Sequence, residues 1–156
     1  PGLTANFDVA KTAALALTLL DWLHVGRSYA TMMVDTAVAL ATELERLDLP
    51  VVRTKVGPTT SHQLAVDATS WGGGSAASRT LRTANLLACA IGLPGLGEFA
   101  GVRFGTPEIT RFGMTAEHMP ELASLIAQAL QGDATDVAIR TSELRSRFDS
   151  IHFVRT

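Results

Sequence analysis

The residue with the clearest chemical purpose is Arg103, which interrupts a short apolar, β-prone run and precedes the turn Gly105-Thr106-Pro107. A guanidinium in such a strand needs an anion, because burying it without a partner is costly. Its planar fork of N–H donors suits a carboxylate held through two parallel hydrogen bonds. The pattern therefore predicts a carboxylate-binding arginine, aimed by a turn that Thr106 and Pro107 shape. The plainer alternative is a surface arginine on an edge strand.

Other polar residues give weaker signals. His62 opens a predicted strand after a run of hydroxyl side chains, and a structural histidine near the site is favoured over an acid–base group. The remaining histidines lack metal-ligand spacing with any cysteine or carboxylate, so no metal site is predicted. Cys89 lies in an apolar segment and is interpreted as a small core residue. The glycines at 72–74 are interpreted as a flexible connection, in preference to a phosphate cradle.

Composition limits the classes of function. The chain has 156 residues, 47% of them hydrophobic and 18% charged, which is enough to bury the core of one domain. A net charge of -2 with scattered arginines argues against nucleic-acid binding. No apolar run reaches the length of a membrane span, and no signal peptide is recognised. A single cysteine agrees with a reducing compartment, so a cytoplasmic location is expected.

The elements expected to position Arg103 form a small sheet with helices packed on it, preceded by long helices. Hydrophobic periodicity and turn residues predict an α/β fold. The helices are expected at 8–23, 28–47 (after an interruption at Gly26), 75–91, 115–130 and 135–148, with a helical turn at 107–112 and strands at 51–54, 62–67 and 101–104.

The segment Gly101-Val102-Arg103-Phe104-Gly105-Thr106-Pro107, followed by Thr110 and Gly113-Met114, resembles a signature of the serine hydroxymethyltransferases. These are fold-type-I pyridoxal-phosphate enzymes. The resemblance extends to Pro1-Gly2 and the helix after it, to the strand at 62–67 and to the helix at 115–130, and so covers nearly the whole chain. The segments Pro1–Asp8, Ser61-His62-Gln63 and Gly105–Ile109 resemble the α-methylserine hydroxymethyltransferase branch more than the housekeeping serine enzymes.

The resemblance implies the small C-terminal domain of that fold, a short and mainly antiparallel sheet covered by helices. Residues 1–25 would complete the cofactor domain or a subunit interface, and residues 26–156 would form the small α/β domain. Arg103 would hold the α-carboxylate of the amino-acid substrate, with His62, Thr106 and Pro107 shaping the site. Thr4, Ala5 and Asn6 occupy the position of a turn that approaches the cofactor phosphate of the adjacent subunit.

The lysines bear on the cofactor. A pyridoxal-phosphate enzyme needs a Schiff-base lysine, but Lys11 opens an alanine-rich helix and Lys55 precedes a Gly-Pro turn. We therefore expect pyridoxal 5'-phosphate on a partner chain, a large subunit in a hetero-oligomer such as a dimer of heterodimers. A first residue of Pro is what remains when an initiator Met is removed, so the small subunit of a split enzyme is preferred over a fragment.

The function that follows from the resemblance is cleavage or formation of the Cα–Cβ bond of serine or α-methylserine, with tetrahydrofolate as the one-carbon acceptor. The loop at 91–100 is shorter than the folate-contacting stretch of the family. This favours, as an alternative, a threonine aldolase or transaldolase type of enzyme that needs no folate. A non-catalytic regulatory subunit of the same fold is the third hypothesis.

Overall fold

The computed structural model describes residues 8–155 of the chain. Its α-helices are α1 (Val9–Arg46), α2 (Gly74–Thr83), α3 (Pro107–Arg111), α4 (Met119–Gln131) and α5 (Ala134–Ser146); its strands are β1 (Gln63–Asp67), β2 (Cys89–Leu93) and β3 (Gly97–Gly105); short 3-10 turns η1 and η2 cover Thr69–Trp71 and Ala116–His118.

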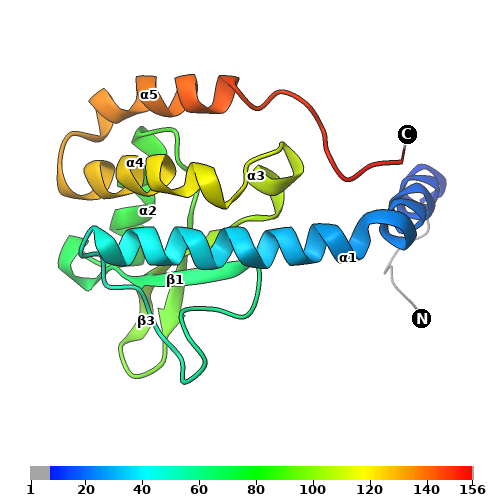
Figure 1. Ribbon diagram of the computed structural model, residues 1–156. Coiled ribbons are helices and arrows are strands. Elements are labelled where there is room, and N and C mark those ends of the chain that lie inside the picture. The colour runs from blue at the N-terminus through cyan, green and yellow to red at the C-terminus, as the bar shows by residue number, and fades with distance from the viewer. Residues whose placement is uncertain (1–7, 156) are drawn as a thin grey trace.

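The three strands form one antiparallel sheet in the order β1-β3-β2, so β3 is the central strand. One face of this sheet is apolar and buried, and its side chains include Leu64, Val66, Val102 and Phe104. Residues of α1, α2 and α4 join these side chains in one hydrophobic core, and α5 lies outside α4 (Figure 1). The arrangement confirms the predicted α/β class with a short antiparallel sheet covered by helices.

Helix α1 is continuous through Gly26, so the predicted interruption at this residue is wrong. The side chain of Asp8 caps the helix by accepting a hydrogen bond from the amide of Lys11 at 3.1 Å. Gly26 is buried, and a Cβ at this position would lie only 2.8 Å from the ring of Trp22. The helix axis turns in this N-terminal region (Figure 1). The glycine thus makes room for an aromatic ring and does not end the helix.

Two further predictions are wrong: the strand at 51–54 is absent, and the helix expected at 75–91 ends earlier. Residues 51–54 form no strand, because beside β1 they make only an isolated bridge from Val51 to Val66. Helix α2 ends at Thr83, well before the expected Ile91, and the chain then enters β2. Asn85 adopts a left-handed conformation with φ 60°, and the amide of Leu86 donates to the carbonyl oxygen of Leu81 at 2.9 Å. This is the hydrogen-bond pattern that closes helix C-termini.

The other predicted elements are present. Strands β1 and β3, the helical turn α3 and helices α4 and α5 occupy the expected places, and Gly132 follows the end of α4. Ahead of α4, the amide of Thr115 donates to the imidazole of His118 at 3.0 Å, as part of a capping box. Within residues 8–155, no helix is long and apolar enough to cross a membrane.

Candidate carboxylate-binding site

Arg103 lies on the central strand β3, two residues before its end at Gly105, with its side chain exposed on the open face of the sheet. Its backbone partners are Ala65 on β1 and Cys89 on β2. Residues directly opposite one another in antiparallel strands share a face, as do alternate residues along one strand. The immediate neighbours of Arg103 on this face are therefore Ala65, Cys89, Gly101 and Gly105, all of them small. The interpretation of Arg103 as an edge-strand residue is thus wrong.

The guanidinium has room and donors for an anion. In the described part of the chain, the salt bridges involve other arginines, and Arg103 takes part in none of them. The four neighbouring positions carry small residues, and the side chain of Leu93 covers Gly101. Pairing on both sides fixes the backbone of Arg103. Cys89 is exposed on the open face of the sheet, so its interpretation as a core residue is wrong.

Thr106 follows the end of β3 and is completely buried. Its amide donates to the carbonyl oxygen of His62 at 3.0 Å. Its hydroxyl donates to the carbonyl oxygen of Met33 on α1 at 2.7 Å and lies 3.2 Å from the His62 carbonyl. One side chain therefore joins the end of the Arg103 strand to the start of β1 and to the long helix.

Pro107 opens α3, and its carbonyl oxygen accepts a hydrogen bond from the hydroxyl of Tyr29 at 2.8 Å. Tyr29 belongs to α1 and is only 7% exposed. Burial raises the pKa of Tyr29, while Arg111 lowers it and Glu108 raises it by smaller amounts. The phenol consequently keeps its proton and acts as a donor at neutral pH.

His62 contributes mainly through its backbone, whose carbonyl oxygen receives the contacts from Thr106. Its imidazole Nε2 lies 2.8 Å from Nε2 of Gln63, the next residue. The described contacts do not join this imidazole to Arg103. Its predicted role beside the site stays a prediction, and Thr4, Ala5 and Asn6 lie outside the described residues.

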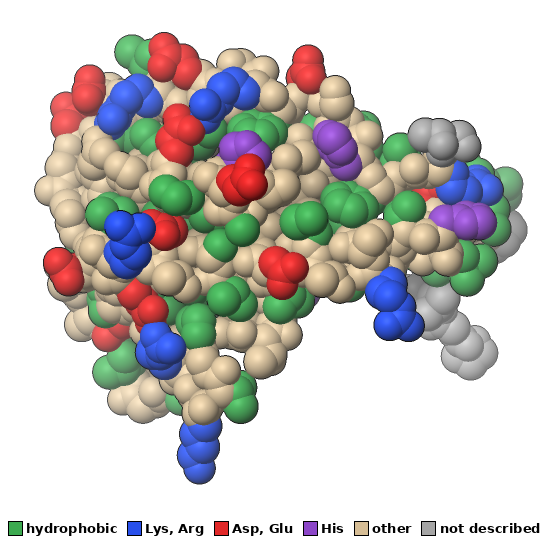
Figure 2. All heavy atoms as spheres, viewed as in Figure 1, with side chains coloured by type: hydrophobic (Ala, Val, Ile, Leu, Met, Phe, Trp, Pro, Cys, Tyr) green, Lys and Arg blue, Asp and Glu red, His purple; other side chains and the backbone are tan. Residues whose placement is uncertain are grey.

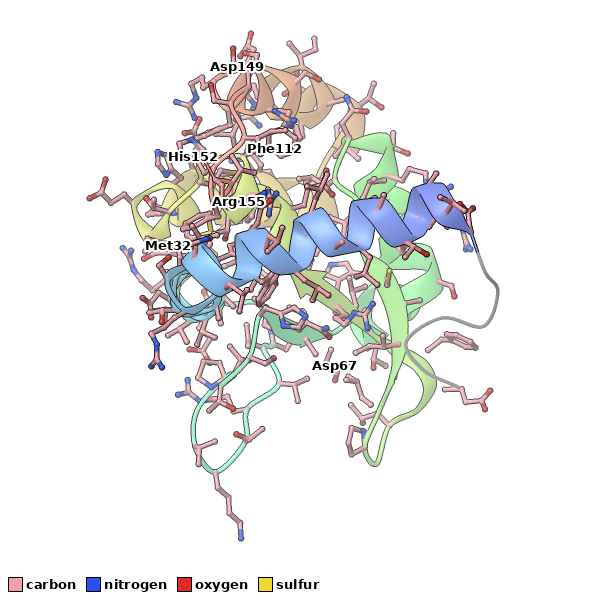
Figure 3. The ribbon with its side chains drawn as sticks, turned by 90° about the vertical axis from the view of Figure 1, so that its right-hand side faces the viewer. Met32, Asp67, Phe112, Asp149, His152 and Arg155 are labelled. Atoms are coloured by element: carbon pink, nitrogen blue, oxygen red, sulfur yellow. The ribbon has the colours of Figure 1, made fainter. Side chains whose placement is uncertain are left out.

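Sequence reasoning missed two residues near this region, Tyr29 and Asp67. Asp67 ends β1 (Figure 3) and shares the open face with Ala65, as the alternation of the strand could have indicated. Hydrogen bonds from the side chain and the backbone of Thr69 lower the pKa of Asp67, so this carboxylate is ionised at neutral pH. Tyr29 gave no local signal, because its partner Pro107 is distant in the chain.

The described residues fit the binding of a carboxylate better than the attachment of a cofactor. Lys11 lies on the first turn of α1 with 85% of its side chain exposed, 3.8 Å from Asp8. Lys55 is exposed in the loop before β1. No strand residue on the open face is a lysine. Among residues 8–155, no group of three or more His, Cys, Asp or Glu side chains is arranged to hold a metal ion.

Comparison with known proteins gives matches along nearly the whole chain. It is 48% identical to an α-methylserine aldolase from Ralstonia sp. and 50% identical to one from Variovorax paradoxus, over 99% of this chain in each case. It is 36% identical to a serine hydroxymethyltransferase from Pyrobaculum aerophilum over 98% of this chain. The chain spans only 36% of the length of each of these relatives. No family model matches.

The fold has a counterpart among solved structures. An L-threonine transaldolase from Pseudomonas fluorescens superposes with a TM-score of 0.80 and 23% sequence identity, over 88% of this chain and 32% of that one. This likeness supports the fold, and the sequence matches support the relationship. The chain therefore corresponds to the C-terminal part of a fold-type-I pyridoxal-phosphate enzyme related to α-methylserine aldolase and serine hydroxymethyltransferase.

Proposed function

We propose that this chain supplies the carboxylate-anchoring part of a pyridoxal-phosphate enzyme that cleaves or forms the Cα–Cβ bond of a β-hydroxy amino acid. The observation that carries the proposal is Arg103, exposed on a central strand among small side chains. The similarity to α-methylserine aldolases along the whole chain supports α-methylserine or serine as the substrate. The enzyme consists of this chain together with a cofactor-carrying part, in one polypeptide or in separate subunits.

In this proposal Arg103 binds the α-carboxylate through two parallel hydrogen bonds. Holding the carboxylate fixes the rotation of the substrate about its Cα–N bond, so that the Cα–Cβ bond stands perpendicular to the cofactor ring. This is a positioning effect, which lowers the barrier by restricting the substrate to a reactive geometry. Pyridoxal phosphate, when bound, supplies the electron sink for the bond cleavage.

The residues around Arg103 support it without touching the reacting atoms. Ala65 and Cys89 leave space for the carboxylate on either side of the strand. Thr106 and Pro107 hold the turn after the strand against α1 through hydrogen bonds of 2.7 and 2.8 Å. Because the first bond is buried and the second is part-buried, the direction of β3 at its end is well defined.

The cofactor attaches, in this proposal, to a lysine of the cofactor-carrying part, since Lys11 and Lys55 are both exposed and neither belongs to a strand of the sheet. The N-terminal part of α1, residues 9–25, is here called the arm. The arm exposes Val9 (69%), Leu17 (57%) and Leu23 (80%), and Figure 2 shows hydrophobic side chains on this projecting part. We propose that the arm packs on the cofactor-carrying part and that Thr4–Asn6 approach the cofactor phosphate there.

A folate-independent aldolase is the leading form of the reaction. The identity to α-methylserine aldolases is 48–50%, against 35–38% for the serine hydroxymethyltransferases. Hydroxymethyl transfer to tetrahydrofolate is the second candidate, because those transferases match the chain over nearly the same residues. Turnover of α-methylserine by the complete enzyme without tetrahydrofolate favours the aldolase, whereas an absolute requirement for tetrahydrofolate favours the transferase.

The test of the anchor is the variant Arg103→Ala in the complete enzyme. Loss of two charge-assisted hydrogen bonds should raise KM for the amino acid by about 100-fold or more. The affinity for ethanolamine, which resembles serine without its carboxylate, should stay within about twofold, since it makes no contact with the guanidinium. Arg103→Lys should fall between, because lysine keeps the charge and loses the fork.

Arg82→Ala is the matched control, as Arg82 is an exposed arginine in the last turn of α2. It should leave both affinities unchanged. A near-normal KM for the amino acid in Arg103→Ala contradicts the anchor. A complete enzyme that binds no β-hydroxy amino acid at all favours the non-catalytic regulatory alternative.

A further inference from the structure

The C-terminal segment after α5, here called the tail (residues 147–155), crosses from α5 to the region where the arm begins (Figure 1). The ring of Phe153 stacks on the ring of Tyr29, with centroids 4.9 Å apart and planes at 25°. The guanidinium Nε of Arg155 lies 3.2 Å from the carboxylate of Asp21 on the arm. His152 donates its amide to the carbonyl oxygen of Arg111 at 2.8 Å. The tail is therefore attached to both α1 and α3; Figure 3 marks His152 and Arg155 beside these helices.

Tyr29 lies where these segments meet. Its ring contacts Phe153 of the tail on one side and Trp22 of the arm, edge-on, with centroids 5.7 Å apart. Its hydroxyl reaches the carbonyl oxygen of Pro107 in the turn that follows the Arg103 strand. One buried side chain thus contacts the arm, the tail and the turn.

The turn is held to α1 at two successive residues. Thr106 donates to the carbonyl oxygen of Met33, and Pro107 accepts from the hydroxyl of Tyr29. Tyr29 and Met33 are one helical turn apart and lie on one face of α1. The same face of the helix consequently holds the end of β3 at two points, which limits rotation of the strand end that carries Arg103.

We infer that Tyr29 is a positioning residue for the carboxylate anchor, acting through the Pro107 carbonyl, and that the tail holds its ring in place. The inference rests on the proposed function of Arg103. Without the hydroxyl, the Pro107 carbonyl loses its hydrogen bond from Tyr29, and the Thr106 hydroxyl makes the remaining hydrogen bond from this turn to α1. The guanidinium then samples more directions, so the conformation that binds the carboxylate is less populated and the affinity for the amino acid falls.

The experiment is Tyr29→Phe in the complete enzyme, which removes the hydroxyl and keeps the ring stacked on Phe153. KM for the amino acid should rise roughly 3- to 30-fold, as expected for the loss of one part-buried hydrogen bond. The values of kcat and of the ethanolamine affinity should change less than about twofold. Thr42→Val is the matched control, because Thr42 on the same helix donates only to the Val38 carbonyl.

Phe153→Leu tests the tail and keeps the hydroxyl of Tyr29, so it carries the test if Tyr29→Phe does not fold. It should raise KM for the amino acid in the same selective way, by a smaller factor. The inference is overturned if these variants weaken the binding of the amino acid and of ethanolamine equally, or weaken neither, while Arg103→Ala shows its carboxylate-specific effect. If Arg103→Ala itself shows no such effect, the proposed function fails first.

Discussion

The two parts of helix α1 have nearly opposite surroundings. From Gly26 to Leu44 the helix buries one face against the sheet and α4, with Ala37, Ala41 and Leu44 fully inaccessible. Before Gly26 the described helix has no buried residue, although its sequence is the more apolar of the two. Hydrophobic content therefore does not separate core from exposed surface in this helix.

Periodicity separates the two parts better than composition does. The buried residues of the second part recur at the spacing of one helix face, as expected for a helix that packs on one side. The arm has apolar side chains on most of its faces, as expected for a helix that is buried on more than one side. Because the helix is continuous, folding of its second part fixes the direction of the arm, which in the proposed function packs on the cofactor-carrying part.

The largest expected effect on stability is at the buried part of α1. Leu44→Ala removes a fully inaccessible side chain and leaves a cavity among its core neighbours. The free energy of unfolding should fall by about 2–5 kcal/mol. Urea denaturation followed by circular dichroism measures this loss. A loss below about 1 kcal/mol would show that the second part of α1 is not the core element described.

An intermediate effect is expected at the contact between this part and the turn. Thr106→Val keeps the shape of the side chain and removes the hydroxyl that donates to the Met33 carbonyl. Because the site is completely buried, the free energy of unfolding should fall by about 1–3 kcal/mol. The same denaturation experiment applies, with Thr42→Val as a control for an exposed threonine of α1. Equal losses in the two variants would contradict a special role for the buried hydroxyl.

The smallest effect on folding is expected in the arm. Leu23 is 80% exposed, so Leu23→Ser should change the free energy of unfolding of this chain by no more than about 0.5 kcal/mol. Its effect should appear in the complete enzyme, as weaker attachment of this domain to the cofactor-carrying part. Sedimentation or thermal denaturation of the complete enzyme measures that attachment. Unchanged attachment would remove the argument that the arm is an interface.

Local signals allowed the central part of the site to be predicted. The Arg103 strand and the turn at Thr106-Pro107 combine β-prone residues with a fixed turn chemistry, and both are in the expected place. Strand β2 was missed because Leu86, Leu87 and Ala88 are good helix formers. The chain after them, Cys89–Leu93, pairs with β3 instead, and pairing between strands is a nonlocal contribution that helix propensity does not contain.

The two hydrogen bonds that join the turn after β3 to α1 could not be predicted from local sequence either. Tyr29 and Pro107 are separated by 78 positions in the chain, and Thr106 and Met33 by 73. Gly26 was interpreted by its usual effect on helices, which the close contact with Trp22 overrides. In each case the deciding contact joins residues whose meeting depends on the completed packing.

In the proposed function, the location of Arg103 on the middle strand limits how the site can adapt to a different acid. A shift of its main chain would disturb the ladders to Ala65 and Cys89 at once. Adaptation to another carboxylate must therefore come from rotation about the side-chain bonds of Arg103, while its main chain stays fixed. Changes in substrate preference among such proteins should accordingly arise in the loops around the sheet, while the strand beneath keeps its register.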